Sequence, residues 1–326
     1  MRRSTFCRLL AGAAVAAASA TLCTPALAAW PDGKTVSLVV PYAPGGTADA
    51  LARLIAEHLA PKLGAPVVVV NRAGASGVIG QSSVAQAPAD GTTVLYDATP
   101  FAINPHLQKM PYDPKKDLQP VMLVGLTPMF VAVGRSSPYK SLQELLKAAR
   151  QSPGKLTFSS GGQGTVQYMG AELLLQGAGV KALHVPYKSG GPAIQAAIAG
   201  EVDFAFGNLP ALHGHVKGGL LKPLAISSAT RHVNYPEVPT LAETALKGFD
   251  VQEWNGIFVP GGTPREVVQR LNTALRQVLD DTRVKARFYT LGSRIVASTP
   301  EDFGKFLAQE EARWAATVKS AGIKRE

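Results

Sequence analysis

The feature that most constrains this chain is the stretch from Val39 to Arg53, where an apolar strand, a Gly-Gly turn and an amphipathic helix follow one another directly. The helix is predicted to bury one face, because its apolar residues recur at helical spacing, and Gly64 stands where a left-handed cap ends a helix. That face consists of Leu51, Leu54, Ile55, Leu59 and Leu63. The helix N-terminus then points out of the core, where its unpaired N–H groups favour carboxylates, phosphates and sulfates.

Three more glycine-rich turns repeat this design, at Asn71 to Gly77, Ser159 to Thr165 and Tyr187 to Pro192. Pro192 suits the first position of a following helix, and Gly200 suits its end. One such turn is a weak signal, because glycine suits any tight connection. Four turns at the carboxyl ends of strands indicate a binding site, since ligands of open α/β sheets bind outside those ends.

The rest of the mature chain alternates short β-branched runs with helical segments, which predicts an α/β fold with parallel sheets flanked by helices. The predicted strands are Thr35 to Val40, Val67 to Asn71, Thr93 to Tyr96, Met129 to Val133, Leu156 to Ser159, Ala182 to Val185 and Val202 to Phe206. The predicted helices are Ala48 to Leu63, Val78 to Ala87, Ser141 to Gln151, Val166 to Gln176, Ala193 to Ala199, Arg265 to Asp280 and Pro300 to Ala321.

Two lobes with two chain crossings fit this length and pattern best. The predicted crossings lie near Leu126 to Phe130 and near Val251 to Phe258. Residues 29–128 together with 252–326 then form the first lobe, and residues 129–251 form the second. The four turns are expected to converge in the cleft between the lobes.

Residues 1–28 have the pattern of an export signal. Three arginines precede an apolar run from Leu9 to Leu22, and Ala26 to Ala28 supplies the small residues of a cleavage site. A membrane anchor is the alternative, but the run is shorter than the ~20 apolar residues that cross a bilayer. The sequence therefore predicts a periplasmic protein that is cleaved near Ala28.

Composition and motifs argue against several function classes for the mature chain. Both cysteines lie in the predicted signal, so the mature chain of 298 residues has no disulfide, thiolate ligand or cysteine nucleophile. The mature net charge is +7, and no basic run interleaved with aromatic residues indicates nucleic-acid binding. Ser76 lacks the G-x-S-x-G elbow, because Val78 replaces the second glycine. The pair His213 and His215 is interpreted as a surface loop rather than a metal site, and no catalytic residue, metal or cofactor is predicted.

Several separated motifs then resemble one family. They are VVPYAPGGTADALAR, VVVVNRAGASGVIG, SSGGQGT, HVPYKSGGPAIQAAIAGEVDFAF, NLP, VPTLAE and EEARWAATVKSAGIK. Together they cover nearly the whole mature chain and resemble the Bug family of periplasmic solute receptors, the substrate-binding proteins of tripartite tricarboxylate transporters. The resemblance implies a two-lobed periplasmic-binding-protein fold of type II, a Venus flytrap that closes on a small organic acid.

The resemblance also implies a ligand-binding set in which main-chain groups and ordered waters hold one carboxylate. The candidate residues are Tyr42, Gly45, Gly46, Thr47, Asp49, Ala75, Thr99, Ser160, Gly164, Thr165, Tyr187, Gly191 and Asn208. Gly207 departs from the family, which often has an aspartate there.

Several of these residues have a second interpretation. Asp49 either complements the helix dipole or organises the ligand site, and Tyr42 lines either the cleft or the core. Thr165 is expected to cap a helix, with or without a ligand. Trp254 lines the cleft or fills the hinge. Arg72 and Lys188 are expected to be solvated.

The predicted function is a receptor, not an enzyme, for a small organic acid such as a di- or tricarboxylate, an acidic amino acid or an aromatic carboxylate. A receptor for an inorganic oxyanion such as phosphate or sulfate is the alternative, since it uses the same helix-terminus physics. The expected partners are the ligand and either membrane transporter subunits of the tripartite type or a sensor protein. The chain is expected to act as a monomer.

Overall fold

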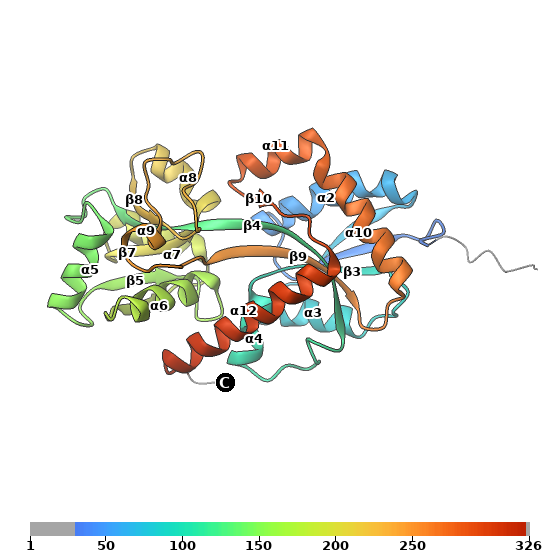
Figure 1. Cartoon of the computed structure of the whole chain (residues 1–326), viewed down its shortest axis with the longest axis horizontal. Coiled ribbons are helices and arrows are strands. Elements are labelled where there is room, and N and C mark those ends of the chain that lie inside the picture. The colour runs from blue at the N-terminus through green and yellow to red at the C-terminus, as the bar shows by residue number, and fades with distance from the viewer. Residues whose placement is uncertain (1–29, 324–326) are drawn as a thin grey trace, which may run out of the picture.

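A computed structural model describes residues 30–323, which form a two-lobed α/β molecule (Figure 1). Its strands are β1 (Val36–Val40), β2 (Val67–Asn71), β3 (Thr93–Ala98), β4 (Leu118–Gly134), β5 (Thr157–Ser160), β6 (Leu183–Pro186), β7 (Phe204–Asn208), β8 (Leu221–Ile226), β9 (Gln252–Pro260) and β10 (Arg294–Ile295). Its helices are α2 (Thr47–Leu63), η1 (Ala75–Gly77), α3 (Val78–Ala85), α4 (Pro100–Leu107), α5 (Leu142–Gln151), α6 (Val166–Gly177), α7 (Gly190–Ala199), α8 (Leu209–Lys217), α9 (Leu241–Thr244), α10 (Arg265–Asp280), α11 (Thr282–Thr290) and α12 (Pro300–Ser320). The predicted export signal lies outside the described residues.

The strands form one sheet in the order β2-β1-β3-β9-β4-β7-β5-β6, with β8 and β10 also paired to β4. The outer strands run parallel, β1 with β2 and β3, and β5 with β6 and β7. The two central strands are antiparallel to their neighbours. The parallel pairing within each half confirms the α/β prediction, and it sends the carboxyl ends of each parallel group to one edge.

The long strands β4 and β9 connect the two halves (Figure 1). β4 pairs with β9 from Leu118 to Pro128, and from Met129 onward it pairs with β7 and then β8. We call β1 to β3, β9, β10, the first part of β4 and the helices η1, α2, α3, α4, α10, α11 and α12 the first lobe. The remaining elements are the second lobe. The change of partner supports the predicted crossings, although the exact boundaries 128/129 and 251/252 stay a prediction.

Local sequence accounts for most helix ends. Gly64 adopts φ 67° and ends α2, as expected, and the Thr165 hydroxyl caps α6 by accepting from the Tyr168 N–H. Two expectations were wrong. α7 begins at Gly190, so Pro192 is its third residue, where the missing N–H of proline still costs no helical bond. His213 and His215 lie on α8 rather than in a loop, because Pro210 starts a helix that tolerates Gly214.

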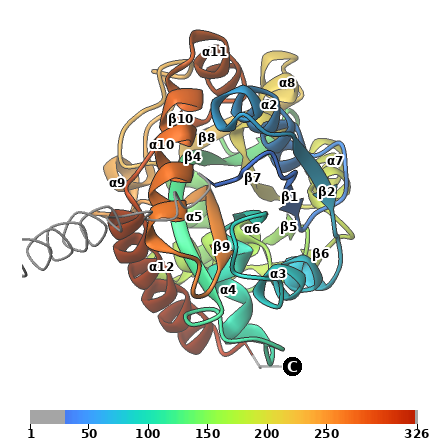
Figure 2. The same ribbon diagram turned by 90° about the vertical axis from the view of Figure 1, so that its right-hand side faces the viewer.

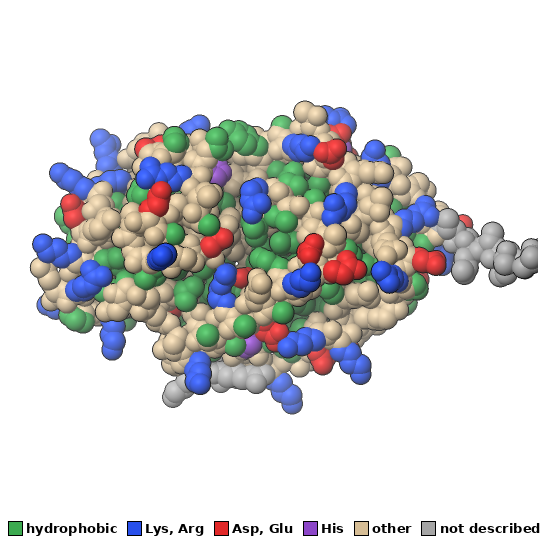
Figure 3. Space-filling model, in the orientation of Figure 1, with side chains coloured by type: hydrophobic (Ala, Val, Ile, Leu, Met, Phe, Trp, Pro, Cys, Tyr) green, Lys and Arg blue, Asp and Glu red, His purple; other side chains and the backbone are tan. Residues whose placement is uncertain are grey.

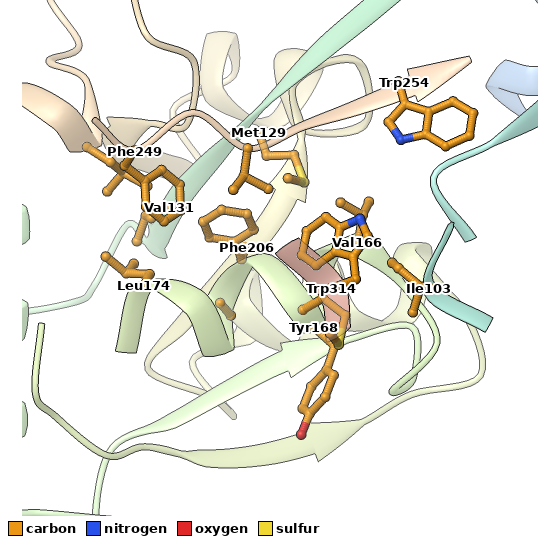
Figure 4. Close-up of a cluster of buried hydrophobic side chains, with 14 of the residues drawn as sticks. Ile103, Met129, Val131, Val166, Tyr168, Leu174, Phe206, Phe249, Trp254 and Trp314 are labelled. Carbon is orange, nitrogen blue, oxygen red and sulfur yellow. The ribbon is translucent and has the colours of Figure 1, made fainter. Parts of the chain in front are cut away.

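One cluster of buried hydrophobic side chains extends into both lobes. Trp254 of β9 and Trp314 of α12 are both fully buried, and each indole N–H donates to the Glu310 carboxylate at 3.1 Å. Side chains from both lobes surround them, including Ile103 of α4, Val166 of α6 and Phe206 of β7 (Figure 4). Trp254 therefore fills the hinge and does not line the cleft. Figure 2 shows α12 on the opposite side of β9 from β1 and β2.

Candidate functional site

The first turn presents open backbone at the N-terminus of α2. Gly45, Gly46 and Thr47 are exposed, and a side chain added at either glycine would meet nothing within 4 Å. Gly45 has φ 90°, which favours glycine, and no side chain caps the helix at Gly46. The Gly45 N–H donates to Asp49, so the unpaired N–H groups at this turn are those of the first turn of α2, where the positive end of the helix dipole also lies.

Asp49 holds this turn in place through its buried carboxylate. Its buried carboxylate accepts hydrogen bonds from the Gly45 N–H at 3.0 Å, from Arg53 Nε at 3.0 Å and from Asn71 Nδ2 at 2.9 Å. The Asn71 amide also donates to the Tyr42 carbonyl, which ties the turn to the end of β2. The hydrogen bond from Arg53, offset in part by burial, lowers the pKa of Asp49 from 3.8 to about 2. Asp49 thus organises the turn, beyond any effect on the helix dipole.

The substitution Asp49→Asn is expected to destabilise the protein by about 1–2 kcal/mol at pH 7, because Arg53 loses its charged partner. Since the folded pKa lies below the unfolded one, the carboxylate stabilises the fold above pH 3.8, and this contribution is lost as the pH falls toward about 2. Urea unfolding between pH 7 and pH 2 should therefore show a weaker acid-induced loss in the variant. Glu57→Gln, an exposed position on the same helix, is the control and should retain the wild-type profile.

The second turn has an unusual backbone. Gly74, Ala75, Ser76 and Gly77 all have positive φ, at 135°, 47°, 53° and 100°. Two consecutive left-handed residues that are not glycine store strain, which is common at ligand sites. Asn104 of α4, which is buried, helps to fix this conformation by donating to the Ser76 carbonyl at 3.0 Å.

The second-lobe turns are organised by their own side chains. The buried Ser160 hydroxyl lies 2.7 Å from His184 Nε2 and accepts from the Gly162 N–H, so it supports the turn that contains Gly164. A side chain at Gly161 would come within 3.1 Å of the Gly190 nitrogen, so the turns after β5 and β6 touch. Gly191 is exposed at the start of α7.

The turns of the two lobes meet in this structure. A side chain at Gly164 would lie 3.3 Å from Ser76 Oγ and 3.6 Å from Asn104 Oδ1, both in the first lobe. A second junction runs through Asn208, whose side chain accepts from Gln167 Nε2 at 2.9 Å and donates to Glu253 of β9. Of the predicted turns, the one after β2 and the one after β5 are therefore brought together across the lobes.

A buried polar network lies behind the first turn. The Tyr42 hydroxyl donates to Asp97 at 2.7 Å, and Gln81 Nε2 donates to the same carboxylate at 2.8 Å. Tyr112 in turn donates to Gln81. Burial raises the pKa of Asp97 to about 6, although these hydrogen bonds oppose the rise. Burial and the Asp97 carboxylate raise the pKa of Tyr42 well above its usual value. Tyr42 is half-buried, and its hydroxyl belongs to this network while its ring packs against the first-lobe core.

Two candidate side chains are directed elsewhere. Thr99 is fully buried, and its hydroxyl accepts from the backbone N–H of Trp254 at 3.0 Å, which anchors the loop after β3 to β9. The Tyr187 hydroxyl donates to Glu201 at the far end of α7. A side chain at Gly207 would come within 3.0 Å of the end of the Leu212 side chain, so a larger residue there requires Leu212 to shift. Arg72 and Lys188 are exposed, as expected.

The sequence did not identify Asn71, Asp97, Asn104 or Glu253 as site residues. In the sequence, each of these residues is a polar side chain beside an apolar run, and no other sequence feature marks it as a site residue.

Other features of the described residues do not compete with this site. A cavity of about 480 Å³ lies between α4 and α12 and contains none of the candidate residues. A hollow of about 640 Å³ beside α7 includes Gly191 but no residue of the first lobe. Among residues 30–323, no three His, Cys, Asp or Glu side chains are grouped to hold a metal ion. Within the same range, no helix has the length and apolar character needed to cross a bilayer.

Comparison with known proteins places this geometry in a family. Residues 51–323 match the model of the tripartite tricarboxylate transporter family receptor. The chain belongs to this receptor family. Protein BugT of Bordetella pertussis is 34% identical over 97% of this chain and 98% of its own length, which bears out the resemblance to Bug proteins.

Two solved structures show the same fold. An R. palustris protein with adipate is 34% identical, with a TM-score of 0.81 over 91% of this receptor and all of that chain. MatC of Rhodopseudomonas palustris, with bound malate, is 32% identical, with a TM-score of 0.75 over 87% of this receptor and 98% of that chain. The two-lobed periplasmic-binding-protein fold is therefore shown, and so is membership of a solute-receptor family.

Proposed function

We propose that this receptor binds a small organic acid between its lobes, with one ligand carboxylate at the N-terminus of α2. The observation that supports this most directly is the open backbone of Gly46 and Thr47 at the N-terminus of α2, together with the contact between the neighbouring first-lobe turn at Ser76 and the second-lobe turn at Gly164. A carboxylate taken out of water must recover its hydrogen bonds, and each charge-assisted bond contributes ~1.5–3 kcal/mol. Three or four such donors are enough for micromolar binding, about 8 kcal/mol.

Arg53, on α2, already bonds other side chains. Arg53 is engaged with Asp49 and donates to Asn71, so backbone groups are left as the main donors. The adipate and malate carried by relatives of known structure support an acid of this size class. We propose no catalytic step, because the chain belongs to a receptor family and its site is built from backbone turns.

The proposal also covers the cellular location of the receptor and its protein partners. We infer that residues 1–28 are an export signal cleaved near Ala28, which delivers the receptor to the periplasm as a monomer. The closed, ligand-bound form would be recognised by membrane subunits of a tripartite transporter or by a sensor protein. Lysines and arginines are dispersed over the face in Figure 3 and form no continuous basic stripe there.

A ligand screen separates organic acids from the inorganic alternative. Di- and tricarboxylates, acidic amino acids and aromatic carboxylates are compared with phosphate and sulfate by thermal shift on the mature protein. At a hundred times its Kd, the correct acid stabilises the fold by about 2.7 kcal/mol, which raises the melting temperature by several degrees. Phosphate and sulfate should have no effect. A shift with an oxyanion and with none of the acids would overturn the proposal.

A further inference from the structure

The cavity of about 480 Å³ in the first lobe lies between α4, α12 and the paired strands β4 and β9, on the face of the sheet opposite α2 (Figure 1 and Figure 2). Its lining includes the buried side chains of Phe101, Leu118 and Phe258 and the partly buried Pro120 and Leu307. None of the glycine turns contributes to it. Its volume falls within the about 300–1,000 Å³ that is typical of small-molecule pockets lined mainly by apolar and aromatic side chains.

The charged residues of this cavity stand at its mouth and already have partners. They are Asp113, Lys115 and Glu311, and all three are exposed or partly exposed. Lys115 Nζ lies 2.9 Å from the Glu311 carboxylate, and the Asp113 carboxylate accepts from the Lys115 backbone N–H at 2.9 Å. The side chains of the interior are apolar, so a charged group carried inside would lose its hydration and find no side-chain partner. The cavity therefore favours an uncharged occupant.

Two aromatic rings form part of the lining. The rings of Phe101 and Phe258 are stacked, with centroids 4.4 Å apart and planes inclined by 29°. Aromatic rings gain energy from offset-stacked and edge-to-face contacts beyond the burial of their area. An aromatic occupant would add such contacts, which a saturated molecule of the same size cannot make.

Gly304 keeps space open inside α12. It lines the cavity, and a side chain built there would meet only Pro120 Cγ, at the ordinary contact distance of 3.9 Å. Its backbone is outside the left-handed region, so neither packing nor conformation requires glycine at this position. Glycine weakens a helix interior relative to alanine. The chain thus leaves this volume unfilled at a cost to its own helix.

We propose that this cavity is a second binding site, separate from the interlobe cleft, for a small uncharged aromatic molecule. The Lys115–Glu311 pair joins the loop before β4 to α12 at the mouth, and an exposed pair contributes little stability, so the mouth can open at small cost. Phe101 and Phe258 also pack against Trp254, with centroids 6.5 and 6.4 Å away, so an occupant would adjoin the hinge. The inference does not depend on which acid the cleft binds.

Calorimetric titration of the mature protein with three matched probes tests the ligand class. 2-Naphthol is uncharged and aromatic, decahydro-2-naphthol is its saturated counterpart, and 2-naphthoate carries a negative charge on the same rings. We expect 2-naphthol to bind with a Kd at or below roughly 100 μM. The other two should displace bound 2-naphthol at least tenfold more weakly. No binding of 2-naphthol, or equally strong displacement by either counterpart, overturns the proposal.

Variants that fill the cavity locate the site. Gly304→Leu should weaken 2-naphthol binding at least tenfold and raise the melting temperature of the ligand-free protein, because it fills the space and removes a helix glycine. Ala308→Phe, at an exposed lining position, should cause the same loss of binding and decides the result if Gly304→Leu does not fold. Ala312→Leu, exposed on α12 and outside the lining, is the control and should bind as wild type.

Binding of 2-naphthol that survives in both filling variants overturns the second site. Gly304→Leu should bind organic acids as wild type does, because Gly304 lies outside the interlobe cleft. Failure of every acid to bind would overturn the proposed function and leave the second site intact, so the two proposals fail separately.

Discussion

Gly164→Phe is expected to weaken ligand binding at least a hundredfold while leaving the ligand-free fold nearly unchanged. Gly164 has an ordinary backbone conformation, so a larger residue causes no local strain. Its first side-chain atom would already press on Ser76 and approach Asn104 of the opposite lobe, and a phenyl ring has no space between them. The variant therefore cannot reach the closed arrangement, and the ligand loses the second-lobe contacts. A hundredfold loss corresponds to ~2.7 kcal/mol, about two charge-assisted bonds.

Calorimetry with the best acid from the ligand screen measures this loss, and a thermal melt without ligand reports stability. Gly214→Phe is the matched control, because Gly214 is exposed on α8 and a side chain there meets nothing within 4 Å. It should bind as wild type. If Gly164→Phe binds within threefold of wild type, the contact between the two turns plays no part in holding the ligand.

Trp254→Ala is expected to cost about 3–5 kcal/mol of stability, the range found when a buried aromatic side chain is removed. The indole is fully buried, packs against Phe101 at 6.5 Å and Phe303 at 5.8 Å between ring centroids, and bonds the buried Glu310. Because these residues belong to one core cluster that extends into both lobes, the loss should lower the stability of the whole molecule.

Urea unfolding followed by circular dichroism measures the effect of Trp254→Ala, and Trp254→Phe should recover most of the packing without the hydrogen bond. Val233→Ala, at a position with 70% of its surface exposed, should change stability by less than about 0.5 kcal/mol. A loss below 1 kcal/mol for Trp254→Ala would show that the hinge core carries little of the stability.

Local sequence patterns were sufficient to predict the elements that bury a single clear face. β2 and α10 have the predicted bounds, and α2 differs by one residue. α4 and α8 were missed, since Pro105 and Gly214 interrupt their apolar spacing and tertiary packing compensates for both. The prediction for β4 covered only Met129 to Val133, because its first half is defined by pairing with β9, far away in the chain.

The site shows the same division between local and distant information. The glycine turns could be recognised because positive φ and exposed amides are encoded within a few residues. The partners of those turns could not, because Asp97 meets Tyr42 and Glu253 meets Asn208 only after the sheet has formed. Thr99 was assigned to the ligand by resemblance, and the burial of its hydroxyl against Trp254 depends on the same long-range pairing.

The sheet order has a consequence for how a bound molecule escapes. β4 and β9 occupy the middle of the order, whereas β2 and β6 lie at its two ends. If the halves rotate about the middle strands, displacement grows with distance from that axis, so the tips beyond β2 and β6 travel furthest. The loop after β3, fastened to Trp254, scarcely moves. Dissociation should thus begin at the periphery and finish at the axis, with the innermost contacts the last to break.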